Sequence, residues 1–155
     1  MGEVAAILGD HRLVGLDSSI FIYQFESDYY PNFAPLAQEF FELAQSGQIE
    51  AVTSTVTLAE ITVVPYRLGM TELAYQYGYV LRTMPHLRLV DIDYRIADRA
   101  AFLRAKYGLK TPDALQIGAA IASGATAFLT ADRELARAGQ EITVTVLKPP
   151  EQPQA

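Results

Sequence analysis

Short apolar runs alternate along this chain with longer segments whose apolar residues recur at helical spacing, and this alternation restricts the fold more than any other feature. The runs span residues 13–16, 51–53, 87–90, 126–130 and 142–147. Runs of this length are typical of strands. Because parallel strands need long crossover connections, which are usually helices, the alternation predicts a single α/β layer structure with a parallel sheet.

The segment that begins at Lys110 is typical of the start of a helix. Thr111 is a suitable N-cap, since its hydroxyl can accept a hydrogen bond from an unpaired backbone N–H group. Pro112 would then occupy the first helical position, where its missing N–H costs nothing. Asp113 follows in the first turn, where the helix dipole favours a carboxylate. Because the residues from there to Gly124 are almost all small or apolar, we expect a buried helix with one carboxylate at its entrance.

Length and composition fit one domain. The chain has 155 residues, of which 50% are hydrophobic and 19% charged, and this is enough for a substantial core. We expect the domain to span residues 1–147 and the proline-containing tail, residues 148–155, to be disordered. The absence of cysteine excludes disulfides, thiolate catalysis and zinc–cysteine sites. No apolar run approaches the roughly 20 residues of a membrane helix, and residues 1–11 do not resemble a signal peptide, so we expect a cytoplasmic protein without a membrane partner.

The formal net charge of -6 does not favour a nucleic-acid binder, because attraction to phosphate needs lysine and arginine. An acidic chain can still act on phosphates if clustered carboxylates hold cations that reverse the local charge. The positions of the carboxylates therefore decide between these possibilities.

Two acids directly follow predicted strands. Asp17 comes after the run 13–16, and Asp132 stands just past the run 126–130. Both would lie at the carboxyl ends of strands, where open α/β sheets bind their ligands. Each also has a structural alternative, because an aspartate before a helix is a common N-cap. Asp93 is most simply interpreted in that second way.

Glu60 is an isolated charge. It lies within the otherwise uncharged stretch 51–66, in a helix predicted from about Thr55. Thr57 and Glu60 match the spacing of a capping box, and Glu60 could equally be an ordinary solvated residue. The third possibility is that Glu60 joins the other three acids at the strand ends.

Four converging carboxylates would repel one another unless cations lay between them. Oxygen donors without cysteine or histidine suit Mg²⁺ or Mn²⁺ better than zinc. Two such ions can activate water and stabilise the leaving oxygen of a phosphodiester. No Ser–His–Asp arrangement is apparent, since His11 and His86 are isolated. The residues therefore favour a metal-dependent nuclease, and the alternative is a non-catalytic α/β binding module whose acids are caps.

Four segments resemble the acidic motifs of PIN-domain nucleases, and most closely those of the VapC-type toxins of VapBC toxin–antitoxin pairs. The segments are LDSSIFIY (16–23), TLAE (57–60), TPDAL (111–115) and LTAD (129–132). The resemblance extends over residues 14–147, and four motifs in this order are far more specific than any one of them. It implies a single PIN-like domain with a central five-stranded parallel sheet flanked by helices.

The resemblance also implies an activity, a cofactor and partners. These are cleavage of RNA with Mg²⁺ or Mn²⁺, frequent homodimers, and a small antitoxin protein that blocks the site. By position, the metal-ligand roles fall to Asp17, Glu60, Asp113 and Asp132, and the supporting hydroxyls are those of Ser18 or Ser19 and Thr130. Many members carry a further acid after the fourth motif, and here Glu134 is not in register with it. A housekeeping RNA-processing nuclease without an antitoxin is the alternative.

Tyr75 and Tyr79 are candidates for a protein interface. They lie one turn apart in the helix predicted around residues 73–84, away from its apolar stripe. Exposed aromatic residues are enriched at interfaces. We expect both to contribute to a homodimer or antitoxin surface, the alternative being that they pack beneath the loop that contains Tyr29 and Tyr30.

Overall fold

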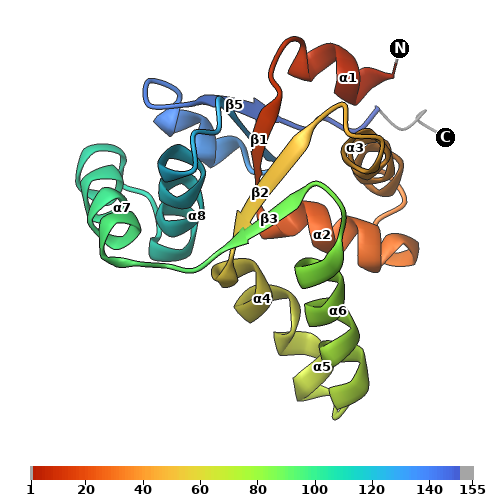
Figure 1. Ribbon diagram of the computed structural model, residues 1–155. Coiled ribbons are helices and arrows are strands. Elements are labelled where there is room, and N and C mark those ends of the chain that lie inside the picture. Colours follow the sequence, from red (N-terminus) through yellow and green to blue (C-terminus); the bar gives the residue numbers. More distant parts are fainter. Residues whose placement is uncertain (1, 151–155) are drawn as a thin grey trace, which may run out of the picture.

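A parallel sheet forms the centre of the computed structural model, which describes residues 2–150 (Figure 1). Its strands are β1 (Leu13–Leu16), β2 (Glu50–Ser54), β3 (Leu87–Val90), β4 (Ala127–Thr130) and β5 (Thr143–Val146). All neighbouring pairs are parallel, which confirms the prediction of a five-stranded parallel sheet. The order across the sheet is β3-β2-β1-β4-β5. It reverses between β1 and β4, and ligands of open α/β sheets bind beyond the carboxyl ends of the strands at such a reversal.

Helices cover both faces of this sheet. They are α1 (Glu3–Leu8), α2 (Ser18–Phe25), α3 (Ala34–Gln45), α4 (Thr55–Ile61), α5 (Val63–Arg67), α6 (Thr71–Thr83), α7 (Tyr94–Tyr107) and α8 (Thr111–Ala122), with short 3₁₀ helices η1 (Ser27–Tyr29) and η2 (Arg133–Ala138). In Figure 1, α7 and α8 lie to the left of the sheet and α2, α3 and α6 to its right, while α4 to α6 extend below it. The chain is therefore an α/β sandwich of three layers.

Each face of the sheet has its own apolar core. One core joins α1, α2 and α3 to β1 around Phe21, and the other joins α7, α8 and η2 around Ile117 and Phe128. Gly15 lets α8 approach β1 closely, because a Cβ atom at that position would lie 2.5 Å from the Cβ atom of Ala120. A helix between parallel strands runs antiparallel to them, so α8 begins at the end where the strands finish.

The start of α8 differs slightly from the prediction. Thr111 is its first helical residue rather than its N-cap, because Lys110 takes the extended cap conformation (φ -70°, ψ 152°) and no side chain caps the helix. Pro112 accordingly occupies the second position. Asp113 lies in the first turn, as expected.

The structure excludes the capping box that was one of the alternatives for Thr57 and Glu60. α4 begins at Thr55, and Ser54 is its N-cap, accepting a hydrogen bond from the Val56 N–H at 3.2 Å. Glu60 therefore lies near the carboxyl end of α4, too far along the helix to close a capping box. The Thr57 hydroxyl is fully buried and is bonded to other elements.

The helix α1 is an element that the sequence did not predict, since no element was expected before residue 13. It packs against α3, where the Ala5 N–H donates to Glu39 Oε2 at 2.8 Å. Asp93 is the N-cap of α7, as predicted, and accepts from the Ile96 N–H at 2.9 Å. Of the tail predicted to be disordered, residues 151–155 lie outside the described residues. Within residues 2–150, no helix is long and apolar enough to cross a bilayer.

Candidate active site

Asp17 is the buried member of the acidic group. It follows β1 directly, and its side chain caps no helix, although the residue occupies the N-cap position of α2. Thr130 Oγ1 and Ser19 Oγ instead donate hydrogen bonds to Asp17 Oδ2 at 2.7 and 3.2 Å. The capping alternative therefore does not account for this side chain. Its carboxylate is held in a fixed orientation at the reversal of strand order, with only 7% of the residue exposed.

Ser18 connects Asp17 to Glu60. Its hydroxyl oxygen lies 3.1 Å from Glu60 Oε1 and 3.4 Å from Asp17 Oδ1. Because a serine hydroxyl has one proton, it donates to one of these carboxylates at a time. α4 thus brings Glu60 beside the end of β1, and Glu60 is neither a cap nor an isolated surface charge.

Asp132 lies just beyond β4 and has two connections. Its Oδ1 accepts from the Glu134 N–H at 2.9 Å, so the residue does cap η2, as the structural alternative held. Its own N–H donates to Thr130 Oγ1 at 3.0 Å. The Thr130 hydroxyl, which is fully buried, therefore links Asp132 to the carboxylate of Asp17. Glu134 forms an exposed ion pair with Arg137, so the structure gives it no place among the acids.

Asp113 shares the electrostatic field of this group. Partial burial is the main cause that raises its pKa above the ordinary range, and the charges of Asp17 and Asp132 raise it further. The nearby ammonium of Lys110 opposes these effects. The first turn of α8 therefore reaches the strand ends, where its carboxylate interacts with two of the other acids.

The pKa of Glu60 is raised in the same way. The main cause is partial burial of its carboxyl group, although the residue as a whole is exposed. The hydrogen bond from Ser18 lowers the pKa, and the charges of Asp17 and Asp113 raise it again. The charged forms of Glu60 and Asp113 are thus disfavoured, and a cation placed beside them would favour these forms.

The chemistry of these donors fits a hard divalent cation. They are carboxylates and hydroxyls from four separate elements, without cysteine or histidine, which is the donor set preferred by Mg²⁺ and Mn²⁺. A divalent cation would also supply the charge that the raised pKa values call for. Within residues 2–150, however, no three acidic, histidine or cysteine side chains are arranged as a ready-made set of ligands.

Tyr23 is a neighbour of the site that sequence reasoning missed. Burial raises the pKa of its phenol, and the charges of Asp17, Tyr30 and Asp132 raise it further. Its ring stacks on that of Phe33, with centroids 4.5 Å apart, and lies 5.0 Å from that of Tyr30. No local pattern signals this position, because its aromatic neighbours come from the loop after α2.

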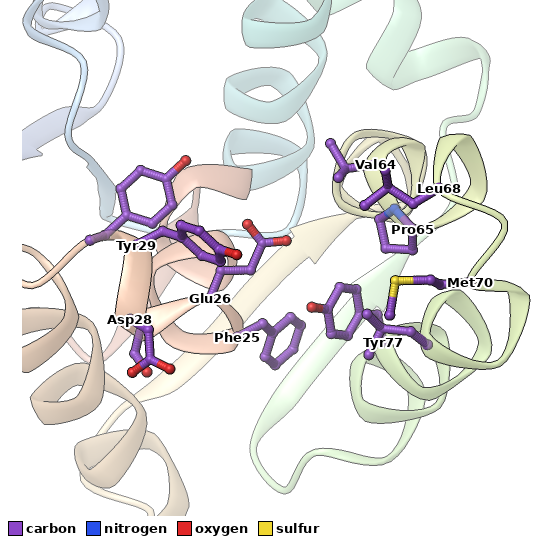
Figure 2. A pocket seen from close by; sticks show the side chains of 12 residues that line it. Phe25, Glu26, Asp28, Tyr29, Val64, Pro65, Leu68, Met70 and Tyr77 are labelled. Atoms are coloured by element: carbon purple, nitrogen blue, oxygen red, sulfur yellow. The ribbon is translucent and has the colours of Figure 1, made fainter.

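A partly apolar groove extends from Tyr30 between two parts of the chain (Figure 2). Its volume is about 780 Å³. The α2–η1 side and the α5–α6 side face each other across it, and the rings of Phe25 and Tyr77, one from each side, stack at 4.7 Å. Glu26 and Asp28 add acidic groups to the lining. The groove therefore joins an apolar surface to negative charge.

The comparisons with known proteins agree with this geometry. The PIN domain family model matches residues 14–141. A toxin–antitoxin complex from Klebsiella pneumoniae has a similar fold, with a TM-score of 0.63 and 19% identity over 87% of this chain and 96% of that one. VapBC2 from Rickettsia felis, bound to a DNA fragment from its promoter, gives a TM-score of 0.67 and 16% identity over 86% and 98%. At these identities the likeness concerns the fold. No curated protein sequence matches the chain significantly.

Proposed function

Because this chain belongs to the PIN domain family, we propose that it is a metal-dependent endoribonuclease that acts in the cytoplasm. The observation that carries the proposal is the oriented carboxylate of Asp17, whose charge acts on both Glu60 and Asp113. A binding module with capping acids accounts less well for the site, since neither Asp17 nor Glu60 caps a helix.

The side chains divide into ligands and supports. The carboxylates that would hold Mg²⁺ or Mn²⁺ are those of Asp17, Glu60, Asp113 and Asp132. Thr130 and Ser19 orient the Asp17 carboxylate, and Ser18 holds Glu60 beside it. When bound, the cation would supply the positive charge that activates water and stabilises the leaving oxygen. Water adds to phosphorus, the bond to the 3′ oxygen breaks, and the products are a 5′-phosphate and a 3′-hydroxyl.

Cleavage of a single-stranded RNA oligonucleotide tests this chemistry. We expect cleavage with Mg²⁺ or Mn²⁺, none with excess EDTA, and 5′-phosphate ends on the products. Asp17→Asn serves as the inactive control, because it keeps the size of the side chain and removes its charge. Cleavage that persists in EDTA, or products with 2′,3′-cyclic phosphate ends, would contradict the metal mechanism.

We further propose that the enzyme is the toxin of a type II toxin–antitoxin pair. Support comes from the two solved structures of similar fold, one of which is described as a toxin–antitoxin complex and the other as VapBC2. The groove beside Tyr30 supports it as well, since an apolar peptide with basic residues would complement its lining. The competing proposal is an RNA-processing nuclease that no antitoxin inhibits.

Co-expression with any small protein that is encoded directly upstream of this one separates the two proposals. An antitoxin should copurify with the enzyme and suppress cleavage of RNA. Leu68→Asp, which places a charge on an exposed groove residue, should weaken the complex and restore cleavage. Phe102→Asp is the matched control, because Phe102 is an exposed residue of α7, outside the groove. Equal inhibition of both variants would argue against the groove as the antitoxin surface.

A further inference from the structure

A buried chain of hydrogen bonds connects the elements that carry the acids. Gln116 Nε2 donates to Thr57 Oγ1 at 2.6 Å, and the hydroxyl oxygens of Thr57 and Thr53 lie 2.6 Å apart. Thr53 Oγ1 donates to the Leu16 carbonyl at 3.1 Å. At the other end of this network, Ser54 Oγ donates to Gln116 Oε1 at 2.7 Å. The four side chains belong to β2, α4 and α8, and none of them is more than 3% exposed.

The direction of each hydrogen bond in this network follows from its partners. The backbone N–H of Ser54 points to Gln116 Oε1 at 3.4 Å, so the oxygen of the Gln116 amide must face Ser54 and its NH₂ group must face Thr57. The single proton of Thr53 goes to the Leu16 carbonyl. Thr57 must therefore donate to Thr53. Every hydroxyl in the network therefore both accepts and donates, and each hydroxyl proton is committed to one partner.

Each end of this network lies close to a carboxylate. Gln116 follows Asp113 by one turn of α8, and Thr57 precedes Glu60 by one turn of α4. The Leu16 carbonyl belongs to the peptide group that continues into Asp17, and the N–H of the same peptide group donates to the Leu129 carbonyl at 3.1 Å. That peptide is therefore held from both sides.

We propose that Gln116 is a positioning residue, which acts through Thr57 and Thr53 to set the distances among Asp17, Glu60 and Asp113. Without a bound cation the three carboxylates repel one another. The helices α4 and α8, which carry Glu60 and Asp113, would relieve this repulsion by moving apart. Buried and fully paired hydrogen bonds oppose that movement, because separating them would leave polar groups unpaired in the interior. The inference rests on the proposed nuclease function and assigns to this site a second layer of residues.

Two substitutions at Thr57 separate positioning from simple packing. Thr57→Val keeps the shape of the side chain and removes its hydroxyl, whereas Thr57→Ser keeps the hydroxyl and removes a methyl group. Both should lower the melting temperature. Thr57→Val interrupts the network, and so does the separate variant Gln116→Met, whereas Thr57→Ser leaves it intact. Ile117→Val, in the core on the same helix, controls for weaker packing of α8.

The measurements are Mn²⁺ binding followed by electron paramagnetic resonance and steady-state cleavage of an RNA oligonucleotide. Thr57→Val and Gln116→Met should weaken Mn²⁺ binding by between about tenfold and about a hundredfold, the range typical of groups that orient metal ligands. The kcat should fall with them while the KM for RNA stays unchanged, since no RNA-facing surface is altered. Thr57→Ser should bind Mn²⁺ like the wild type, as should Ile117→Val.

Three results would overturn the proposal in different ways. If Thr57→Val and Thr57→Ser lose stability alike and both bind Mn²⁺ normally, the network is structural only. If Ile117→Val weakens Mn²⁺ binding as much as Thr57→Val, general loosening of the core is the cause. If the wild type neither binds Mn²⁺ nor cleaves RNA, the proposed function fails, and the inference fails with it. Should Gln116→Met not fold, the pair of Thr57 variants still decides.

Discussion

At the scale of single residues, Glu60 is the acid whose replacement is easiest to interpret. Asp132 caps η2 and Asp17 is buried among hydroxyls, so replacing either of them changes stability as well as charge. Glu60 is exposed, and its hydrogen bond from Ser18 joins it to the site rather than to the end of a helix. Glutamine keeps the shape of the side chain and can still accept that hydrogen bond.

We expect Glu60→Gln to melt at or above the wild-type temperature in metal-free buffer near neutral pH, because the change relieves repulsion from Asp17 and Asp113. Mg²⁺ or Mn²⁺ should stabilise the wild type by mass action and the variant much less. RNA cleavage should fall by orders of magnitude. Melting curves with and without metal, and one cleavage assay, check this. If Glu60 were only a surface residue, Glu60→Gln would change the free energy of unfolding by less than about 0.5 kcal/mol and leave both the stabilisation by metal and the cleavage of RNA intact.

The same acids predict an unusual dependence of stability on pH. The folded protein raises the pKa values of Glu60 and Asp113 above their values in the unfolded chain. At pH values between the unfolded-state pKa and the folded-state pKa of each group, the folded protein binds more protons than the unfolded chain. The free energy of unfolding should therefore fall as pH rises from about 4 through the folded pKa values. Urea unfolding in EDTA across this range should show that slope for the wild type and a weaker one for Glu60→Gln. A wild type that gains stability over the same interval would contradict the raised pKa values.

Residue roles were only partly predictable from the sequence. Asp17 and Asp132 present the same local pattern, an aspartate between a strand and a helix, yet only the side chain of Asp132 caps. What separates them is Thr130, which reaches Asp17 across the sheet from another strand. A capping box was one alternative for Thr57, and its actual partner Gln116, 59 positions away along the chain, cannot be inferred from local spacing.

At the scale of secondary-structure elements, local signals succeeded where they were strong. The five strands and the start of α7 at Asp93 agree with the predictions. The start of α4 at Thr55 also agrees, although Ser54, Thr55 and Thr57 are all suitable caps and only the fold selects Ser54. The start of α8 was misplaced by one residue, because Lys110 rather than Thr111 takes the N-cap position. The short helix α1 has no strong local signal, and its contacts with α3 account for its place in the fold.

The N-cap of α7 gives a prediction at this scale. Asp93→Ala removes the 2.9 Å hydrogen bond to the Ile96 N–H and should lower the free energy of unfolding by about 1 kcal/mol. Since none of the four acids belongs to α7, kcat should not change. Asp91→Ala is the matched control, because Asp91 is exposed and precedes the helix; it should lie within about 0.5 kcal/mol of the wild type. Urea unfolding measures both variants, and an equal loss in the two would rule out capping as the cause.

At the scale of the whole molecule, two exposed surfaces lie on either side of α6. Tyr77 faces the groove of Figure 2, together with Leu73. Tyr75 and Tyr79 line a separate shallow depression and are 65% and 62% exposed. They therefore do not pack beneath the loop of Tyr29 and Tyr30, which was the alternative from sequence. If the groove receives an antitoxin, the surface of Tyr75 and Tyr79 is left for a second copy of the chain.

We therefore predict that Tyr75 and Tyr79 contribute to a homodimer. Large aromatic side chains at an interface center often account for much of its binding energy, so the double variant Tyr75→Ala, Tyr79→Ala should shift the protein towards monomer. Sedimentation equilibrium at several concentrations measures this directly. Tyr94→Ala is the control, because Tyr94 is 88% exposed at the start of α7 and lines neither surface. The double variant should keep its melting temperature and its inhibition by an antitoxin. A mass equal to that of the wild type at every concentration would exclude this surface as the dimer interface, and loss of antitoxin inhibition instead would assign it to the other partner.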